Sequence, residues 1–507
     1  MTVRPSRSLV LAHLLLRYAG RRVLRAGVLA SRPIRLAVGV ALLALLAAAV
    51  AGAVTFLAPL REEPEAWELL LDVTTVSTVM WCLAAAVLVK TLFLNAEGML
   101  ALTFALPVTN RERAAAFVLY EGAMSAAVVT AGVCSLSIAS LVVRGPGGLV
   151  PLVEAVALPA LLTYLTVSLA HQVLSRLLTA VGLRRAQPVV LVVLLFVLLV
   201  AHVSTVPRLA AEASSAYLSG SGERPWTSAV GVLADRIGHP AALAGGLALV
   251  VALAVATVLL TPDRHLRQAR FLPWRAGPVT GRLFGPYDWC AFRSFQTWLP
   301  AVLAVALLVA LCVRPVAHPL WALSVLSMGA LYQFAATDPL RRLRGGTPSA
   351  WAVYGYLVRA QALLWLTAAA PATVAVIAVR PETAGGLAVP LVASLAGVLV
   401  ALGVGIIFPA EDDNPFSVFV GVSLTAALVA LLGLGVGILQ LPPAAAASFA
   451  VATVALFVVY SVIGIAASTS RSRHEEGPRP RQQPGRSRAA DPRDRHPDPA
   501  VPHVLER

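Results

Sequence analysis

Five charged residues lie within or near long apolar stretches of the chain: Asp72, Lys90, Glu121, Glu154 and Arg359. A charged side chain far from water is costly, so each of them is a candidate functional residue. Lys90 and Arg359 stand near the ends of their stretches, where long side chains can extend to a polar phase. Glu121 and Glu154 are set further in. We therefore expect these two carboxylates to be the polar residues inside the apolar region.

The chain carries no recognisable catalytic motif. A phosphate-binding loop ends in Gly-Lys followed by Ser or Thr, but the only lysine, Lys90, follows Val89 inside an apolar stretch. The His-Glu-x-x-His and Gly-x-Ser-x-Gly patterns of hydrolases do not occur either. Four cysteines and nine histidines are scattered without metal-ligand spacing. We expect no enzyme activity, metal or cofactor in this chain, so any ATP hydrolysis belongs to a partner.

Two polar segments stand out between apolar stretches. The first reads Leu-Pro-Val-Thr-Asn-Arg-Glu-Arg-Ala at 106–114. Pro107 ends any helix that precedes it. Thr109 or Asn110 can cap a new helix, and the negative charge of Glu112 is favourable at the positive N-terminal end of that helix. The second segment reads Asp-Pro-Leu-Arg-Arg-Leu-Arg-Gly-Gly at 338–346.

Composition determines which elements hold these residues. Of 507 residues, 58% are hydrophobic and 13% are charged, and the mean hydropathy is +0.80. The apolar residues come in runs of about twenty, which match the hydrocarbon thickness of a bilayer. In lipid every backbone polar group needs an internal partner, so the runs must be helices. We predict an all-α polytopic membrane protein with about 12 transmembrane helices, near 36–59, 69–93, 114–143, 149–171, 188–206, 241–260, 298–316, 319–336, 353–379, 384–407, 416–439 and 446–468.

The arginines predict the orientation of these helices. With a cytoplasmic N-terminus, 33 of the 40 Lys and Arg residues lie in cytoplasmic segments. This asymmetry follows the positive-inside rule and explains the net charge of +15 without nucleic acid. The bias toward Ala, Val, Leu, Arg and Pro is typical of a GC-rich, actinobacterial-like genome. We expect a multi-pass protein of a bacterial cytoplasmic (inner) membrane, with both termini cytoplasmic and the lipid bilayer as its surroundings.

The expected helices form two six-helix halves, an internal repeat of a kind common among transporters. Residues 36–260 are the first half and 298–468 the second, joined by a basic cytoplasmic connector at 261–297. Residues 1–35 are a basic cytoplasmic or interfacial segment. The tail, 469–507, has almost no apolar residues, so we expect it to be disordered.

The N-terminal segment has the pattern of an amphipathic helix. Arg17, Arg21 and Arg25 are four residues apart and share one helical face, while Leu11, Leu14 and Leu15 lie elsewhere on the wheel. Such a helix is expected to lie on the cytoplasmic membrane surface with its arginines facing lipid phosphates.

The segment at 106–114 resembles the membrane subunits of type-2 ABC exporters, in which a Leu-Pro-(Val/Leu)-(Ser/Thr)-Arg-Arg-Glu-like stretch leads into the third helix. Leu106, Pro107, Val108, Thr109, Arg111 and Glu112 match this pattern, while Asn110 replaces a usual Arg. A second similarity is Gly-Val-Gly-Ile-Ile-Phe-Pro at 403–409, since a Phe-Pro turn is frequent in that family.

The resemblance implies a permease subunit of an ATP-driven exporter, working with a separate ATP-binding subunit in two copies. It also implies that short cytoplasmic segments of each half contact that subunit. Carried over to this sequence, the contact residues are Pro107, Thr109, Arg111, Glu112, Arg113, Asp338, Arg341 and Arg342.

Two other functions fit the same number of helices. A twelve-helix secondary transporter shares the long central cytoplasmic connector, but its Gly-x-x-x-Asp-Arg-x-Gly-Arg-Arg signature is missing after the second helix, and Asp338 to Arg342 is only a partial counterpart. A non-transporting membrane protein, such as an assembly factor, is the other alternative. A neighbouring ATPase gene would favour the exporter.

Overall fold

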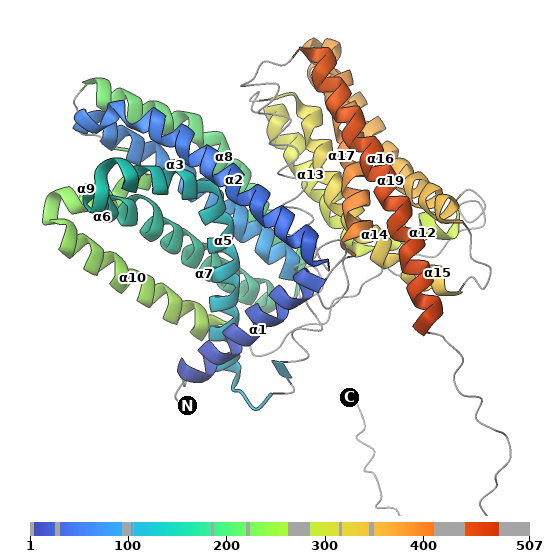
Figure 1. Cartoon of the computed structure of the whole chain (residues 1–507), viewed down its shortest axis with the longest axis horizontal. Helices are drawn as coiled ribbons and strands as arrows, with labels where there is room; N and C mark the ends of the chain where they lie inside the picture. The colour runs from blue at the N-terminus through green and yellow to red at the C-terminus, as the bar shows by residue number, and fades with distance from the viewer. Residues whose placement is uncertain are drawn as a thin grey trace, which may run out of the picture.

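The computed structural model of the chain is all-α. It describes residues 5–25, 31–93, 103–104, 106–183, 187–219, 224–261, 284–313, 317–343, 349–409 and 442–475. The helices gather in two bundles, one from α1 to α10 and the other from α12 to α19 (Figure 1). The expected all-α fold is therefore confirmed.

The first bundle contains long helices joined by short helical turns. Its elements are α1 (Pro5–Arg25), α2 (Arg32–Leu57), η2 (Pro59–Glu62), α3 (Pro64–Phe93), α5 (Asn110–Arg144), η3 (Gly145–Gly148), α6 (Leu149–Leu152), η4 (Val153–Ala157), α7 (Leu158–Ala180), α8 (Gln187–Ser219), η5 (Trp226–Ser228), α9 (Ala229–Ile237) and α10 (His239–Leu260).

The second bundle begins with the short helix α12. Its elements are α12 (Pro286–Arg293), α13 (Phe295–Val313), η6 (Pro319–Leu326), α14 (Ser327–Ala336), α15 (Asp338–Leu343), α16 (Ala350–Val379), η7 (Pro381–Gly386), α17 (Ala388–Ile407) and α19 (Pro443–Glu475).

Nine stretches of the described residues are long and apolar enough to cross a membrane. One of them, Asn110–Ala180, contains the spans expected at 114–143 and 149–171; the chain turns at Gly145, whose φ is +65°. The expected span 416–439 lies outside the described residues. The span 446–468 falls in α19, where the apolar stretch Val451–Ala467 is shorter than the nine. A multi-pass membrane protein is thus confirmed, while twelve spans stay a prediction.

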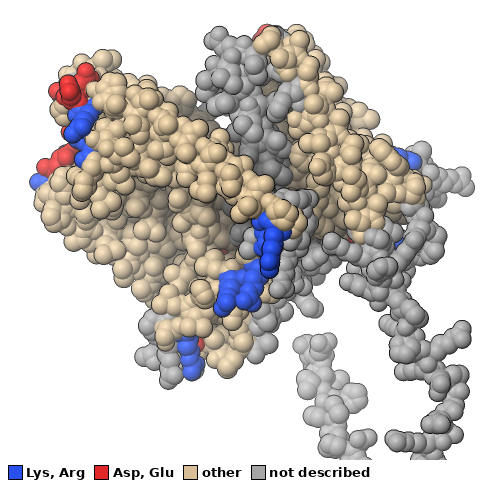
Figure 2. Space-filling view, viewed as in Figure 1, with Lys and Arg blue, Asp and Glu red and all other residues tan. Residues whose placement is uncertain are grey.

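The surface of the first bundle agrees with a lipid environment. Figure 2 shows charged side chains over the α2–α3 turn and α9 at one end, and over α1 and the start of α2 at the other. A broad uncharged surface separates these ends. Large hydrophobic side chains stand exposed along it, such as Leu43 on α2 at 68% and Leu247 on α10 at 59%. In water such a surface would be unstable, whereas lipid covers it.

Each bundle has its own packed centre. In the first, α3 packs against α5, α7 and α8, with Leu83, Val167 and Leu195 in one of the apolar clusters. In the second, α17 packs along α14. A Cβ atom at Gly405 of α17 would lie 2.4 Å from the carbonyl oxygen of Leu331, so this approach requires glycine.

Two segments are more helical than the sequence predicts. The stretch 207–240, which lies between the expected spans 188–206 and 241–260, is largely helical, because α8 continues through Pro207 to Ser219 and α9 follows. Leu209 and Ala213 are buried beyond that proline, and this packing outweighs the lost backbone hydrogen bond. The tail expected to be disordered from 469 begins as the last turns of α19, which ends at Glu475.

The N-terminal helix forms as predicted but does not lie only on lipid. Leu11 and Leu15 of α1 are buried against α5, next to Tyr120, whereas Arg17 and Arg21 are exposed. The side chain of Arg25 is outside the described part. The sequence pattern alone could not reveal this protein-facing side, because leucines suit lipid and protein equally.

Candidate functional site

The segment at 106–113 enters α5 through a capping box. The Thr109 hydroxyl accepts a hydrogen bond from the Glu112 backbone N–H at 3.3 Å, and the Glu112 carboxylate accepts one from the Thr109 N–H at 2.9 Å. The prediction that Thr109 or Asn110 caps this helix is confirmed for Thr109. The reciprocal bonds satisfy two backbone donors and fix the direction in which the chain enters the helix.

The side chain of Arg113 also stabilises this segment. Its guanidinium donates to the Asn110 side chain at 2.9 Å and to the Thr103 carbonyl at 3.3 Å, and lies 3.9 Å from the centre of the Phe104 ring. Glu112 and Arg113 are 2% and 6% exposed. These two predicted contact residues therefore hold the segment's shape, and they present little surface to any partner.

The other side of the segment packs onto the protein. Leu106 and Val108 contact the apolar cluster formed by Leu11 and Leu15 of α1 with Tyr120 of α5. Pro107, Thr109 and Arg111 remain exposed. The result is a rigid turn that presents Pro107 and Arg111 outward.

The second predicted segment forms the short helix α15. Arg341 donates to the Phe334 carbonyl at 2.9 Å and to the Asp338 carboxylate at 3.3 Å, and lies 3.6 Å from the centre of the Phe334 ring. Arg342 also belongs to α15, and 344–346 lie outside the described residues. Like the side chain of Arg113, the side chain of Arg341 therefore stabilises the local fold.

Lys90 and Glu121 form an ion pair between α3 and α5. Lys90 is 8% exposed and Glu121 is 9% exposed. The expectation that Lys90 extends to the polar phase is therefore wrong: a carboxylate 31 residues away compensates its charge inside the bundle.

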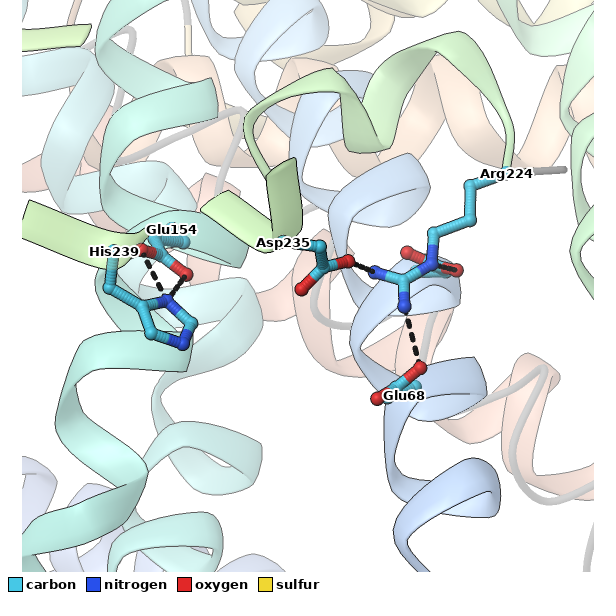
Figure 3. Close-up of polar contacts among 6 residues, drawn as sticks. Glu68, Glu154, Arg224, Asp235 and His239 are labelled. Atoms are coloured by element: carbon cyan, nitrogen blue, oxygen red, sulfur yellow. Dashed lines mark hydrogen bonds and ion pairs between the residues drawn. The ribbon is translucent and has the colours of Figure 1, made fainter. Parts of the chain in front are cut away.

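Glu154 lies in the π-helical turn η4 and not beside Glu121. Both of its carboxylate oxygens are 3.0 Å from Nδ1 of His239, the first residue of α10 (Figure 3). Glu154 is 5% exposed, whereas the His239 side chain is 55% exposed. The pair ties the first turn of α10 to the turn that precedes α7, so the two predicted carboxylates belong to separate sites.

Arg224 contacts three carboxylates. Its guanidinium nitrogens lie 2.5 Å from Glu68, 3.1 Å from Asp235 and 3.8 Å from Asp72 (Figure 3). These contacts hold the segment before η5 and the end of α9 against the first three turns of α3. Sequence reasoning missed this network because it assigned 207–240 to an outward loop between two expected spans.

Arg359 of α16 pairs with a buried acid of α12. Its guanidinium lies 3.4 Å from the carboxylate of Asp288, which is 2% exposed and also accepts a hydrogen bond from the Gly285 N–H at 2.8 Å. The Arg359 side chain is 56% exposed. It thus reaches the surface as predicted for a long side chain, while holding α12 on α16.

Within the described ranges, no group of three or more His, Cys, Asp or Glu side chains is placed to hold a metal ion. No protein-family model matches the chain, and comparisons with curated proteins and with solved structures found no match. The resemblance to type-2 ABC exporters therefore depends on the sequence segments at 106–114 and 403–409.

Proposed function

We propose that this chain is the permease subunit of an ATP-driven exporter of the type-2 ABC kind, acting with two copies of a separate ATP-binding subunit at the cytoplasmic membrane. The observation that carries the proposal is the rigid turn at 106–113. A coupling element must transmit a movement of its partner to the membrane helices. The side that packs on the protein must therefore be rigid, and the opposite side must be exposed to the partner. The Thr109 capping box and the Arg113 contacts supply the stiffness, and Pro107 and Arg111 supply the exposed face.

A repeated arrangement of helices supports the proposal of two six-helix halves. α1 packs on α5, and α12 packs on α16; α10 packs on α7, and α19 packs on α17. Both α5 and α16 start with a side-chain cap, from Thr109 and Ser349. Twelve residues after each cap stands a buried polar residue, Glu121 in one helix and Gln361 in the other. Such two-fold plans are common among transporters.

The experiment is native mass spectrometry of the protein purified from its own host in mild detergent. We expect a complex with a nucleotide-binding subunit in two copies. Arg111→Glu should release that subunit, because Arg111 is exposed and can make charge-assisted bonds to an acidic groove. Its matched control is Arg208→Glu on α8, an arginine whose side chain is 82% exposed and lies on the predicted outer side.

The control should leave the complex intact, and both variants should keep the thermal stability of the parent protein. A preparation without any ATP-binding subunit, or one in which Arg111→Glu keeps it fully bound, would contradict the proposal. A secondary transporter would then be favoured, because the buried charges of Lys90 and Glu121 are of the kind that ion-coupled transporters use.

A further inference from the structure

The helix α1 has two sides of different chemistry. Its buried side, which packs on α5, is formed by Ser8, Leu11, Ala12, Leu15 and Ala19. Arg17 and Arg21 are exposed, and a helical step of about 100° per residue places them on the opposite side. Val10, which is 67% exposed, lies between these two arginines on the helical wheel. The side of α1 that faces away from the protein is therefore basic and apolar at once.

Large apolar side chains border the arginines on both flanks of α1. On the helical wheel Leu9 lies on one flank and Leu14 on the other, and they are 58% and 43% exposed. A purely polar partner, such as a nucleic acid, would cover the arginines and leave these leucines in water. Arginines beside exposed leucines are typical of a helix that lies at a membrane surface.

The start of α2 indicates where the lipid headgroups lie. Its apolar stretch, Arg35–Leu57, is long enough to cross a membrane, so the headgroups of one leaflet lie near the beginning of this stretch. Arg32, the first residue of α2, is exposed there. Figure 2 shows basic side chains over α1 as well as over the start of α2. The arginines of α1 and α2 thus form one basic surface at the level of the headgroups.

The protein offers these arginines little negative charge of its own. The first acidic residue of the chain is Glu62. The helix under α1, α5, has two acidic residues, Glu112 and Glu121, and these are bound to the Thr109 N–H and to the Lys90 ammonium. The counter-charge must therefore come from outside the chain. Phosphates of anionic lipids supply it at this level of a membrane.

We propose that α1 and the start of α2 form a docking surface for anionic phospholipids of the predicted cytoplasmic leaflet. Arg17, Arg21 and Arg32 bind the lipid phosphates, and Leu9 and Leu14 contact the acyl chains. An arginine guanidinium can donate two parallel hydrogen bonds to one phosphate, which makes it well suited to this role.

The same helix connects the lipid to the turn at 106–113. Leu11 and Leu15 of α1 belong to the apolar cluster that also contains Tyr120 of α5, and Leu106 and Val108 pack against this cluster. A lipid that holds α1 in place therefore stabilises the surface on which the turn is packed. This role concerns the membrane side of the turn, so it does not depend on an ATP-binding partner.

A lipid titration of the full chain tests the docking surface. The protein in neutral detergent is mixed with anionic phosphatidylglycerol or with zwitterionic phosphatidylcholine, and its thermal unfolding is followed. We expect phosphatidylglycerol to stabilise at a lower concentration, and the difference to shrink at high salt because salt screens exposed charges. Equal stabilisation by the two lipids at low salt would overturn the proposal. An equal effect of inorganic phosphate without lipid would also overturn it, since the surface would then bind free anions.

A double substitution on α1 locates the effect. Each basic residue at an anionic surface contributes roughly a fivefold gain in binding, so Arg17→Gln with Arg21→Gln should require roughly tenfold more phosphatidylglycerol, or above, for half of the stabilisation. The matched control is Arg208→Gln with Arg236→Gln, two exposed arginines with acidic neighbours on the predicted outer side. This control should respond like the parent protein. An α1 variant that responds like the parent protein would overturn the proposal.

Hydrogen exchange in nanodiscs tests the connection to the turn. Compared with phosphatidylcholine alone, phosphatidylglycerol should slow amide exchange at 106–113 several-fold in the parent protein and leave it unchanged in the α1 double variant. Exchange in η7, on the predicted outer side of the second bundle, serves as the internal control and should be the same in both lipids. Equal exchange at 106–113 in both lipids would overturn the connection to the turn, whereas the titration decides the docking surface itself.

Discussion

The contact between α14 and α17 gives the sharpest prediction about the fold. In Gly405→Ala, the added Cβ would lie 2.4 Å from the carbonyl oxygen of Leu331 and 2.9 Å from its Cα and carbonyl carbon. These are backbone atoms of α14, so no side chain can rotate away and the helices must separate. Overpacking of this kind costs about 1–3 kcal/mol.

The control is Gly397→Ala in the same helix, where an added Cβ meets no atom within 4 Å. Alanine favours a helix over glycine by about 1 kcal/mol at either position, so this gain cancels between the two variants. We therefore expect Gly405→Ala to be less stable than Gly397→Ala by about 1–3 kcal/mol.

Both variants would be compared by equilibrium unfolding in mixed detergent micelles, with helical circular dichroism as the signal. Equal stability of the two alanine variants would refute the reasoning, because it would mean that α14 and α17 do not approach as closely as the geometry requires. A Gly405→Ala variant that fails to express, beside a normal Gly397→Ala variant, agrees with it.

Three further predictions concern charges and orientation. Lys90→Met should lose about 3–5 kcal/mol of stability by leaving Glu121 buried without its partner, whereas Lys90→Met with Glu121→Leu should lose much less; a double variant as unstable as the single one would argue against the ion pair. Arg224→Gln should speed amide hydrogen exchange at 226–237, because it releases the contacts to Glu68 and Asp235, and unchanged exchange there would count against the network. Cysteine at Glu63 or Ser221 should react with an impermeant thiol reagent from outside, and cysteine at Arg267 should not; the reverse pattern would invert the predicted topology.

Features that depend only on residues close together in the sequence could be predicted from the sequence. Run length and hydropathy are local properties, so most of the apolar helices in the described part of the chain lie where the sequence predicts them. The cap at Thr109 is also local, since its bonds join residues three positions apart. The helical N-terminal segment follows from periodicity for the same reason.

Contacts between residues that lie far apart in the sequence were determined only by tertiary packing. Lys90 meets Glu121 from 31 residues away, Glu154 meets His239 from 85 residues away, and Arg224 meets Glu68 from 156 residues away. No local pattern predicts such partners, because a charge in an apolar run can face lipid, reach water or find a counter-charge. The hydropathy of the helices ensures that the chain enters the membrane, and the packing of α3, α5 and α7 determines which polar groups meet inside it.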